Sequence, residues 1–395
     1  MDGHDISNQV NASVHGYSGT VADSLANFAS SLDPKVIAAI QELGDEFPYN
    51  LDMNDGNELG VDPVFVQEHN IDVVLNALVT RILPDGAFSG GPVLRFRSVE
   101  ASASSDKEPT IFTATKEIII SAGAVRTPQL LLLSGVGPKS HLDAMGVETL
   151  VDNPSVGDRF ADHPALQIEF YSNEPFPTDE DRLEWMREWN ETRSGRLTIS
   201  STNMRGYSRM TEVELTEYER RFGLPDPAPG KKASHYELIF LRNVEATTQS
   251  TVVVIICNLN PRSYGQIRLN TTDPYASPLI SPNMLNEEAD AHVLKVGYKA
   301  ARRFLNPTVF NDFLLGPLNN ETFPDSNDDQ DIHEFIRSKA FSLRHPSGSA
   351  AMSRDGVEQG VVDPNLKLKG AQGVRVVDAS VFVPRSRFHS DPVLF

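Results

Sequence analysis

The segment from Lys116 to Pro138, KEIIISAGAVRTPQLLLLSGVGP, constrains the fold of this 395-residue chain more than any other stretch. The continuous apolar run at Ile118–Ile120 is typical of a strand buried on both faces of a parallel sheet. Small residues follow, and Thr127-Pro128 then provides a capping hydroxyl and a proline suited to the first turn of a helix over Leu130–Leu133. Such a strand, turn and helix bring backbone N–H groups toward an anionic or polar cofactor, although an ordinary connection within a core fits the same pattern.

The charge of the chain excludes two classes of partner. The net charge is −19 and the pI is near 4.9, whereas nucleic acids and anionic membranes attract basic surfaces. We therefore expect no nucleic-acid partner and no membrane partner, and no apolar run approaches the roughly 18 residues of a spanning helix. Cys257 is the only cysteine, which excludes an intrachain disulfide. The N-terminal MDGHDISNQV lacks a basic-then-apolar signal pattern, so the sequence does not assign a compartment.

Three segments of the chain resemble one enzyme family. Residues 121–138, SAGAVRTPQLLLLSGVGP, resemble the second signature of the glucose–methanol–choline (GMC) flavin oxidoreductases, and NASVHGYSG at 11–19 and DMNDG at 52–56 resemble two loops of that family. In the family the second signature packs beside the flavin. The resemblance therefore implies FAD as the cofactor, with Ala122 and Gly123 among the residues that bind it.

Two further segments resemble the FAD domain of the family. Residues 70–83, NIDVVLNALVTRIL, match a strand in which the backbone of a valine, here Val79, contacts the FAD adenine. The simpler alternative is that Val79 fills a strand core. Residues 153–163, NPSVGDRFADH, resemble P-x-V-G-x-N-L-x-D-H, with an arginine in place of the asparagine. The pair Asp162-His163 that ends this segment is more typical of a structural role than of a catalytic one.

The C-terminal residues 341–395 carry the strongest functional signal. FSLRHPSGSAAM resembles the family's H-P-x-G-T-x-x-M, with Ser349 in place of threonine. By position, the resemblance implies His345 as the general base and His389 as the partner that holds the substrate oxygen. Histidine suits the first role because its pKa lies near neutrality. The alternative for each histidine is a surface residue, or a core residue with satisfied hydrogen bonds.

The segment VVDASVF belongs to the same C-terminal region. It resembles a family segment that lies near the flavin and the pyrophosphate, so the resemblance implies Asp378 and Ala379 as cofactor-binding residues. The alternative is an ordinary turn at the end of a strand. No CxxC or HExxH spacing occurs in the chain, so we expect no metal site.

These patterns predict an α/β (α+β) chain with an incomplete FAD-binding Rossmann-like domain and a substrate domain built on a mostly antiparallel sheet with helices. Strand-like runs occur at 197–201, 236–241, 252–259 and 266–269, and a helical apolar stripe lies within 287–305. The expected division is a substrate-domain segment at 1–56, a partial FAD-binding domain at 57–165, a substrate-binding domain at 166–340, and a C-terminal active-site and FAD-domain segment at 341–395.

The resemblance implies FAD-dependent oxidation of a primary alcohol to an aldehyde. The alcohol would give its hydroxyl proton to His345 and a hydride to flavin N5, and oxygen or a quinone would accept the electrons. A histidine at position 389 resembles the fungal aryl-alcohol oxidase branch, which makes aryl alcohols candidate substrates. Members of this family are often secreted.

The family's opening strand–GxGxxG–helix unit, which holds the ADP part of FAD, has no counterpart in this sequence. We therefore expect an N-terminally truncated member, whose activity without that unit is not predicted. Two alternatives stay open, a non-catalytic remnant or binding protein and an FAD-containing hydroxynitrile lyase. Flavin absorbance of the purified protein tests the first alternative, and cyanide release from a cyanohydrin tests the second.

Overall fold

The computed structural model divides the chain into two compact units. The residues that it describes are 32–44, 47, 74–86, 94–198, 204–243, 249–318, 324 and 328–383. The first unit contains Met1–Ile71, Pro164–Asn260 and Glu288–Leu343, and the second contains Asp72–His163, Pro261–Glu287 and Arg344–Phe395. Both units mix helices and strands, which confirms the α/β class expected from the sequence. The division into four domain segments stays a prediction.

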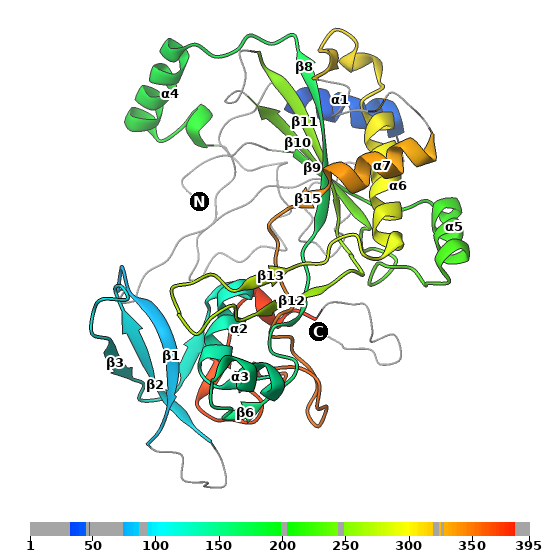
Figure 1. Cartoon of the computed structure of the whole chain (residues 1–395). Helices are drawn as coiled ribbons and strands as arrows, with labels where there is room; N and C mark the ends of the chain where they lie inside the picture. The colour runs from blue at the N-terminus through cyan, green and yellow to red at the C-terminus, as the bar shows by residue number, and fades with distance from the viewer. Residues whose placement is uncertain are drawn as a thin grey trace, which may run out of the picture. The chain divides into compact units, whose positions relative to one another are not determined.

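A six-stranded antiparallel sheet forms the core of the first unit (Figure 1). The β-branched run TVVVIICN suits a buried central strand, and this strand pairs with its neighbour from Tyr236↔Asn258 to Asn243↔Thr251. The predicted strands near 236–241 and 252–259 are therefore confirmed. In spatial order the strands are β14 (Leu314–Pro317), β8 (Pro164–Ser172), β11 (Thr251–Asn258), β10 (Tyr236–Asn243) and β9 (Met204–Ser208), and β15 (Phe341–Ser342) also pairs with β8.

Helices pack against this sheet. The long helix α6 (Glu288–Phe304) lies on β10 and β11 through the apolar stripe that the sequence predicts. Gly297 allows a close approach, because a Cβ there would lie 2.6 Å from the side chain of Ile256. The other helical elements of the unit are α1 (Asp33–Leu43), α4 (Asp179–Thr192), η4 (Arg196–Thr198), α5 (Glu212–Phe222), η5 (Thr308–Phe310) and α7 (Asp329–Lys339).

One predicted strand of this unit is wrong at its start. Leu197 and Thr198 lie in the 3-10 turn η4, and the rest of the predicted strand at 197–201 lies outside the described residues. The chain turns at this point because Gly195 has a φ of 87° and its carbonyl accepts a hydrogen bond from the backbone N–H of Thr198 at 3.0 Å.

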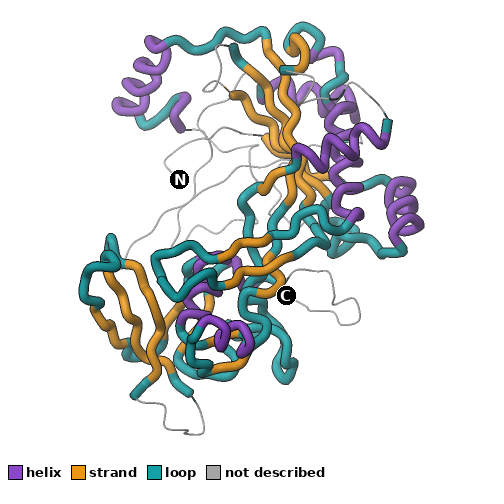
Figure 2. Tube along the Cα trace, in the orientation of Figure 1, coloured by secondary structure: helices purple, strands orange, loops and turns teal. Residues whose placement is uncertain are grey.

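Short sheets build the second unit (Figure 2). One of them is the parallel pair of β4 (Ile118–Ile120) and β16 (Val374–Val376). The other strands are β1 (Leu78–Pro84), β2 (Phe96–Ser102) and β3 (Thr110–Thr113) in one antiparallel sheet, β13 (Leu279–Ser281), β12 (Gly265–Arg268) and β7 (Asp158–Phe160) in a second, and the parallel pair β5 (Val136–Gly137) and β6 (Val151–Asp152). The helical elements are α2 (Gly123–Leu133), α3 (Lys139–Met145) and η6 (Ala379–Val381).

The strand β4 is parallel, as the sequence predicts, but it is not buried on both faces. Ile118 and Ile120 are 8% and 3% exposed and belong to the hydrophobic core of the unit, whereas Ile119 is 59% exposed. Successive side chains of a strand point to opposite faces, and only one face of β4 packs on this core. The prediction of burial on both faces, which was based on the continuous apolar run, is therefore wrong for this strand.

The helix after β4 begins earlier than its local capping signals predict. It starts at Gly123 rather than after Thr127, so Pro128 lies inside it. Its start is stabilised from a distant segment, because the backbone N–H of Gly123 donates to Asp378 Oδ2 at 3.0 Å across 255 residues of sequence. Within the described ranges, no helix of either unit has the length and apolarity needed to cross a bilayer.

Candidate active site

One buried carboxylate positions two histidines in the second unit. Asp162, which is 7% exposed, accepts the backbone N–H of His163 at 2.8 Å and the backbone N–H of His345 at 2.9 Å, both on Oδ1. Next to this carboxylate, Ala161 and Ser347 form an antiparallel bridge with two backbone hydrogen bonds of 3.0 and 2.8 Å. The two histidine-bearing segments are therefore aligned by their backbones.

The two imidazole rings meet at their Nδ1 atoms. The Nδ1 atoms of His163 and His345 lie 3.2 Å apart, and the rings are nearly perpendicular at 82°. A hydrogen bond between these nitrogens requires one ring to donate and the other to accept. His345 is exposed and His163 is partly buried, so the accessible member of the pair is the predicted base.

The backbone just before His345 adopts a rare conformation. Arg344 has a φ of 64°, in the left-handed region that side chains other than glycine seldom occupy. Such conformations persist where the surrounding structure holds them, and they concentrate at functional sites. Here the hydrogen bond from the N–H of His345 to Asp162 holds the chain immediately after the turn.

A second cluster lies at the carboxyl ends of the parallel strands β4 and β16. The Ser121 hydroxyl donates to the carbonyl of Val377 at 2.8 Å, and the N–H of Gly123 donates to Asp378. The carboxyl ends of adjacent parallel strands are a common place for ligands in α/β proteins. The structure therefore brings Ala122 and Gly123 beside Asp378, and the contact of these residues with the cofactor stays a prediction.

The carboxylate of Asp378 already has three donors from its own protein. Oδ2 accepts from the N–H of Gly123 and, at 2.6 Å, from the hydroxyl of Thr127, and Oδ1 accepts from the N–H of Ser380 at 2.8 Å. These bonds join the start of α2 to the start of η6. Asp378 thus connects the two predicted cofactor segments.

The histidine pair and the Asp378 cluster belong to one network. The N–H of Gly348 donates to the carbonyl of Ala379 at 3.2 Å, and the N–H of Ala350 donates to the carbonyl of Ser380 at 2.8 Å. The segment that carries His345 therefore lies beside η6 and is hydrogen-bonded to it. Five predicted site residues share this network, namely Ala122, Gly123, His345, Asp378 and Ala379.

Two predicted site residues have a different outcome. Val79 lies on β1, where it pairs with Ala101 of β2 and is 37% exposed. A bulge between Val79 and Arg81 interrupts the pairing of β1 with β2, at the point where the sequence predicts a backbone contact to the FAD adenine. That contact stays a prediction. His389 lies outside the described residues, as do the segments 11–19 and 52–56.

The arginine that replaces the family's asparagine lines a cavity of about 280 Å³. Arg159 has a φ of 57° and places its guanidinium 5.9 Å from the ring centroid of Tyr264. The cavity adjoins the segment that follows His345, through Ala351 and Met352.

Sequence reasoning treated Asp162-His163 as structural and did not detect that these residues contact His345. The two histidines are 182 residues apart in the sequence, and no local spacing signals their contact. The only available signal was the polar pair at the end of the family-like segment 153–163.

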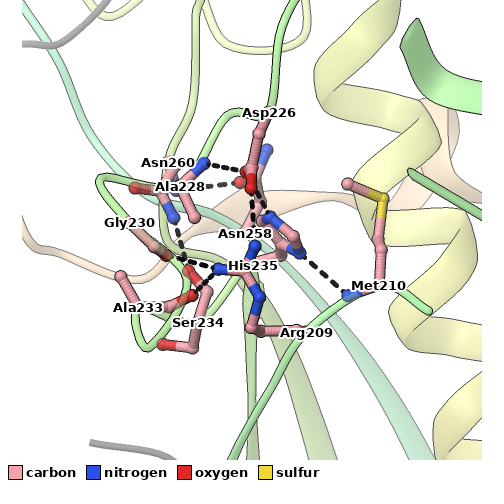
Figure 3. Close-up of polar contacts among 10 residues, drawn as sticks. All are labelled: Arg209, Met210, Asp226, Ala228, Gly230, Ala233, Ser234, His235, Asn258 and Asn260. Carbon is pink, nitrogen blue, oxygen red and sulfur yellow. Dashed lines mark hydrogen bonds and ion pairs between the residues drawn. The ribbon is translucent and has the colours of Figure 1, made fainter. Parts of the chain in front are cut away.

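Another histidine cluster, in the first unit, has the composition of a catalytic dyad (Figure 3). His235 is fully buried, and its Nε2 lies 2.7 Å from Asp226 Oδ1. Its Nδ1 accepts the backbone N–H of Met210 at 2.8 Å, so the proton of a neutral ring lies on Nε2 and is donated to Asp226. No lone pair is left to act as a base, and no spacing in the sequence predicts this cluster.

Charge and burial define the state of this cluster. Burial lowers the pKa of His235, and the hydrogen bond to Asp226 opposes that effect only in part. Burial acts to raise the pKa of Asp226, but hydrogen bonds from His235, Ala228 and Arg209 outweigh it and lower the pKa. Arg209 contacts the carboxylate at 2.6 Å. The cluster is therefore a neutral histidine held between a backbone amide and an ion pair, which is a structural arrangement.

Comparison with known proteins identifies the family. Two sequence profiles described as GMC oxidoreductase match the chain, one at residues 60–165 and the other at residues 261–390. Pyranose dehydrogenase 3 of Leucoagaricus meleagris is 33% identical over 419 residues, which cover 96% of this chain and 66% of that protein. The chain thus spans about two thirds of the length of this relative.

Solved structures agree on the fold. A formate oxidase variant of Aspergillus oryzae RIB40 superposes with a TM-score of 0.80 at 22% identity, covering 95% of this chain and 72% of the oxidase. A fungal aryl-alcohol oxidase superposes with a TM-score of 0.77 at 24% identity, covering 95% of this chain and 71% of the oxidase. FAD is the cofactor of the family that these comparisons indicate, as the sequence analysis expected. The chain belongs to the GMC oxidoreductase family of flavoproteins.

Proposed function

We propose that this chain oxidises an alcohol to the corresponding aldehyde with FAD, using His345 as the base. The observation that supports the proposal most directly is the placement of His345 by Asp162. The carboxylate holds the backbone of the histidine in place. Gly348, in the same segment, donates its backbone N–H to the carbonyl of Ala379 at the proposed cofactor site. An exposed imidazole is thereby connected rigidly to the residues that resemble the family's flavin contacts.

The residues at the ends of β4 and β16 fit an FAD molecule. Gly123 has a φ of 79°, and within the described residues no atom lies within 4 Å of the position that a Cβ would take, so these residues leave space above its backbone. Ala122 is exposed beside it. The carboxylate of Asp378 is already bonded to three protein donors, and the N–H groups of Ala122 and Gly123 donate to Thr127 Oγ1 and Asp378 Oδ2. Ala122, Gly123 and Ala379 would therefore border the cofactor through the close approach that small side chains allow, and not through those two N–H groups.

The protein residues supply position and proton transfer in this proposal. Bound FAD would supply the hydride acceptor, its N5 atom. His345 would take the hydroxyl proton of the alcohol on Nε2, while the adjacent carbon gives up its hydrogen with both electrons and becomes the carbonyl carbon. By resemblance to the family, His389 would hold the substrate oxygen. Oxygen or a quinone would finally accept the electrons.

The substrate is proposed as a primary alcohol, with aryl alcohols among the candidates. The comparisons contain a pyranose dehydrogenase and an aryl-alcohol oxidase, so sugars and benzylic alcohols are the two classes to compare. The active-site histidines alone do not separate these classes, because both present a CH–OH group to the base. Substrate choice must come from residues that surround the alcohol carbon.

The test uses the purified full chain, first examined for flavin absorbance. Benzyl alcohol or a pyranose sugar, added without oxygen, should bleach the flavin, and oxygen or 1,4-benzoquinone should restore its colour. His345→Ala should slow flavin reduction by about 10²- to 10⁴-fold, the usual contribution of a general base. His333→Ala is the control, since His333 lies on α7 of the first unit and is partly exposed.

Three results would contradict the proposal. A protein that binds no flavin even when FAD is added would support the non-catalytic alternative. Flavin reduction at the wild-type rate in His345→Ala would remove His345 from the reaction. Release of cyanide from mandelonitrile without flavin reduction would identify a hydroxynitrile lyase instead.

A further inference from the structure

We propose that His163 is a positioning residue, which holds a proton on Nδ1 of His345 and keeps the lone pair of His345 on Nε2. The inference deepens the proposed function, because it assigns a reason why Nε2 of His345 can act as the base. It rests on that function only for the role of His345, whereas the contact between the two rings is a feature of the structure itself. Asp162 and the strand bridge beside it hold this contact in place.

The contact between the two rings determines which nitrogen of His345 carries its proton. A neutral imidazole carries one proton, on either Nδ1 or Nε2. The distance of 3.2 Å between the Nδ1 atoms allows a hydrogen bond only if one ring donates and the other accepts. His345 can accept a substrate proton on Nε2 only when its own proton lies on Nδ1. In that arrangement His163 accepts on Nδ1 and carries its proton on Nε2.

The opposite proton arrangement makes His345 inactive as a base. If His163 instead donates from Nδ1, then Nδ1 of His345 must accept and the proton of His345 moves to Nε2. Nε2 then has no lone pair for the alcohol, so the base is inactive. Only one of the two proton arrangements of this pair is therefore compatible with catalysis.

The contact between the two rings also stabilises the charge that forms on His345 during the reaction. When His345 takes the substrate proton it becomes an imidazolium and still donates from Nδ1. The neutral His163 then accepts from a charged donor, and such hydrogen bonds are stronger than those between neutral groups. His163 therefore stabilises the protonated base without contacting the substrate.

Backbone hydrogen bonds hold the two histidine residues close together. Asp162 Oδ1 bonds the N–H of both histidines, and the bridge between Ala161 and Ser347 fixes the register of their segments. Orienting groups of this kind determine the tautomer of functional histidines in many proteins. The structure thus supplies the fixed geometry that such a role requires.

The experiment compares His163→Leu with His163→Asn in protein labelled with ¹⁵N at histidine. Asparagine can place a carbonyl oxygen close to the position of Nδ1 and accept the same hydrogen bond, whereas leucine cannot. Two-bond ¹H–¹⁵N spectra, assigned through His345→Gln, report which nitrogen of neutral His345 carries the proton. We expect the Nδ1–H form in the wild type and in His163→Asn, and a shift toward the Nε2–H form in His163→Leu.

Flavin reduction gives the second readout. His163→Leu should lower the rate constant of flavin reduction by about 10- to 100-fold, by analogy with the loss when the group that orients a metal-binding imidazole is removed, and His163→Asn should recover most of this loss. The KM should change little, because His163 does not contact the substrate. His141→Leu is the matched control, since its Nε2 accepts the backbone N–H of Leu269 in the same unit. It should not alter the tautomer of His345.

The spectra separate this inference from the proposed function. If the tautomer of His345 depends on residue 163 but no alcohol reduces the flavin, the positioning role survives and the proposed function fails. If His345 is essential for flavin reduction and its tautomer is the same in His163→Leu and the wild type, the positioning role is overturned. An Nε2–H form of His345 in the wild type would overturn it as well.

Discussion

The hydroxyl of Ser349 donates a hydrogen bond of 2.5 Å to the carbonyl oxygen of Ala124. This carbonyl lies four residues before Pro128 in the helix α2, and Pro128 has no N–H to donate to it. In an α-helix the N–H of each residue bonds the carbonyl four residues earlier, and proline has no N–H. Ser349 is 0% exposed and lies 225 residues away in the sequence. A distant hydroxyl therefore supplies the donor that allows the helix to continue through its proline.

Ser349→Ala should lower the free energy of unfolding by about 1–3 kcal/mol, because it leaves a buried carbonyl without a donor. Ser349→Thr, the residue that the family carries here, should retain most of the stability. Urea unfolding of the purified variants measures both. In a Pro128→Ala background, where residue 128 regains an N–H, Ser349→Ala should cost less, and additive costs in this double-mutant cycle would refute the explanation.

Gly123→Ala should lower the free energy of unfolding by about 1–2 kcal/mol, since Gly123 has a φ of 79° and the added methyl group meets no atom of the described residues within 4 Å. Gly157→Ala is the matched comparison, with a φ of 71° and a methyl group that would clash with the carbonyl of Ile267. Overpacking adds about 1–3 kcal/mol to the same backbone strain, so this variant should be the less stable in urea.

The same Gly123→Ala variant tests the proposed cofactor site. Its methyl group would occupy the open space assigned to FAD, so flavin bound per protein, measured by absorbance, should fall. Wild-type flavin content in this variant would exclude a close approach of the cofactor to Gly123.

His292 should make the first unit less stable at mildly acidic pH. It is 6% exposed between Tyr218 and Phe222, and within the described part of the chain neither ring nitrogen has a hydrogen-bond partner. Burial, followed by the charge of Lys295, lowers the pKa of His292 from 6.5 to about 4. Below about pH 6.5 the unfolded chain therefore binds a proton that the folded chain does not, and stability decreases until about pH 4.

The expected loss from His292 is about 2 kcal/mol between pH 7 and pH 5, at roughly 1.4 kcal/mol per pH unit below the unfolded pKa. His292→Phe places another aromatic ring between Tyr218 and Phe222 and removes the titration. Urea unfolding at the two pH values should show a smaller difference in this variant than in the wild type. An unchanged difference would assign the acid sensitivity to other groups.

His235 and His345 should respond oppositely to the same substitution. His235→Ala leaves the Met210 N–H and the Asp226 carboxylate without their buried partner, which should cost about 2–4 kcal/mol of stability. Flavin reduction per bound flavin should be unchanged. His345→Ala, at an exposed position, should leave stability within about 0.5 kcal/mol and abolish most of the activity. Loss of catalysis without loss of stability in His235→Ala would contradict the structural role of that cluster.

Several elements followed directly from local sequence patterns. The β-branched run of β11, the apolar stripe of α6 and the apolar run of β4 each lie where the sequence predicts them. Backbone propensity and hydrophobic periodicity depend on neighbouring residues, so a single sequence contains these signals. The motifs around Gly123, His345 and Asp378 also indicated the family and its cofactor before any coordinates.

Other features depended on contacts between distant segments. The start of α2 is set by Asp378 and its passage through Pro128 by Ser349, so the local cap at Thr127 was misleading. The exposure of Ile119 likewise depends on which face of β4 is covered.

By itself, the sequence determined the family, the cofactor class and the positions of a few elements, among them β4, β10, β11 and α6. The tertiary structure alone decided that His163 meets His345 and that one buried carboxylate holds both. The physical reason is the range of the interactions: a torsional preference is encoded within a few residues, whereas a hydrogen bond between residues 182 positions apart exists only after the chain has folded around it.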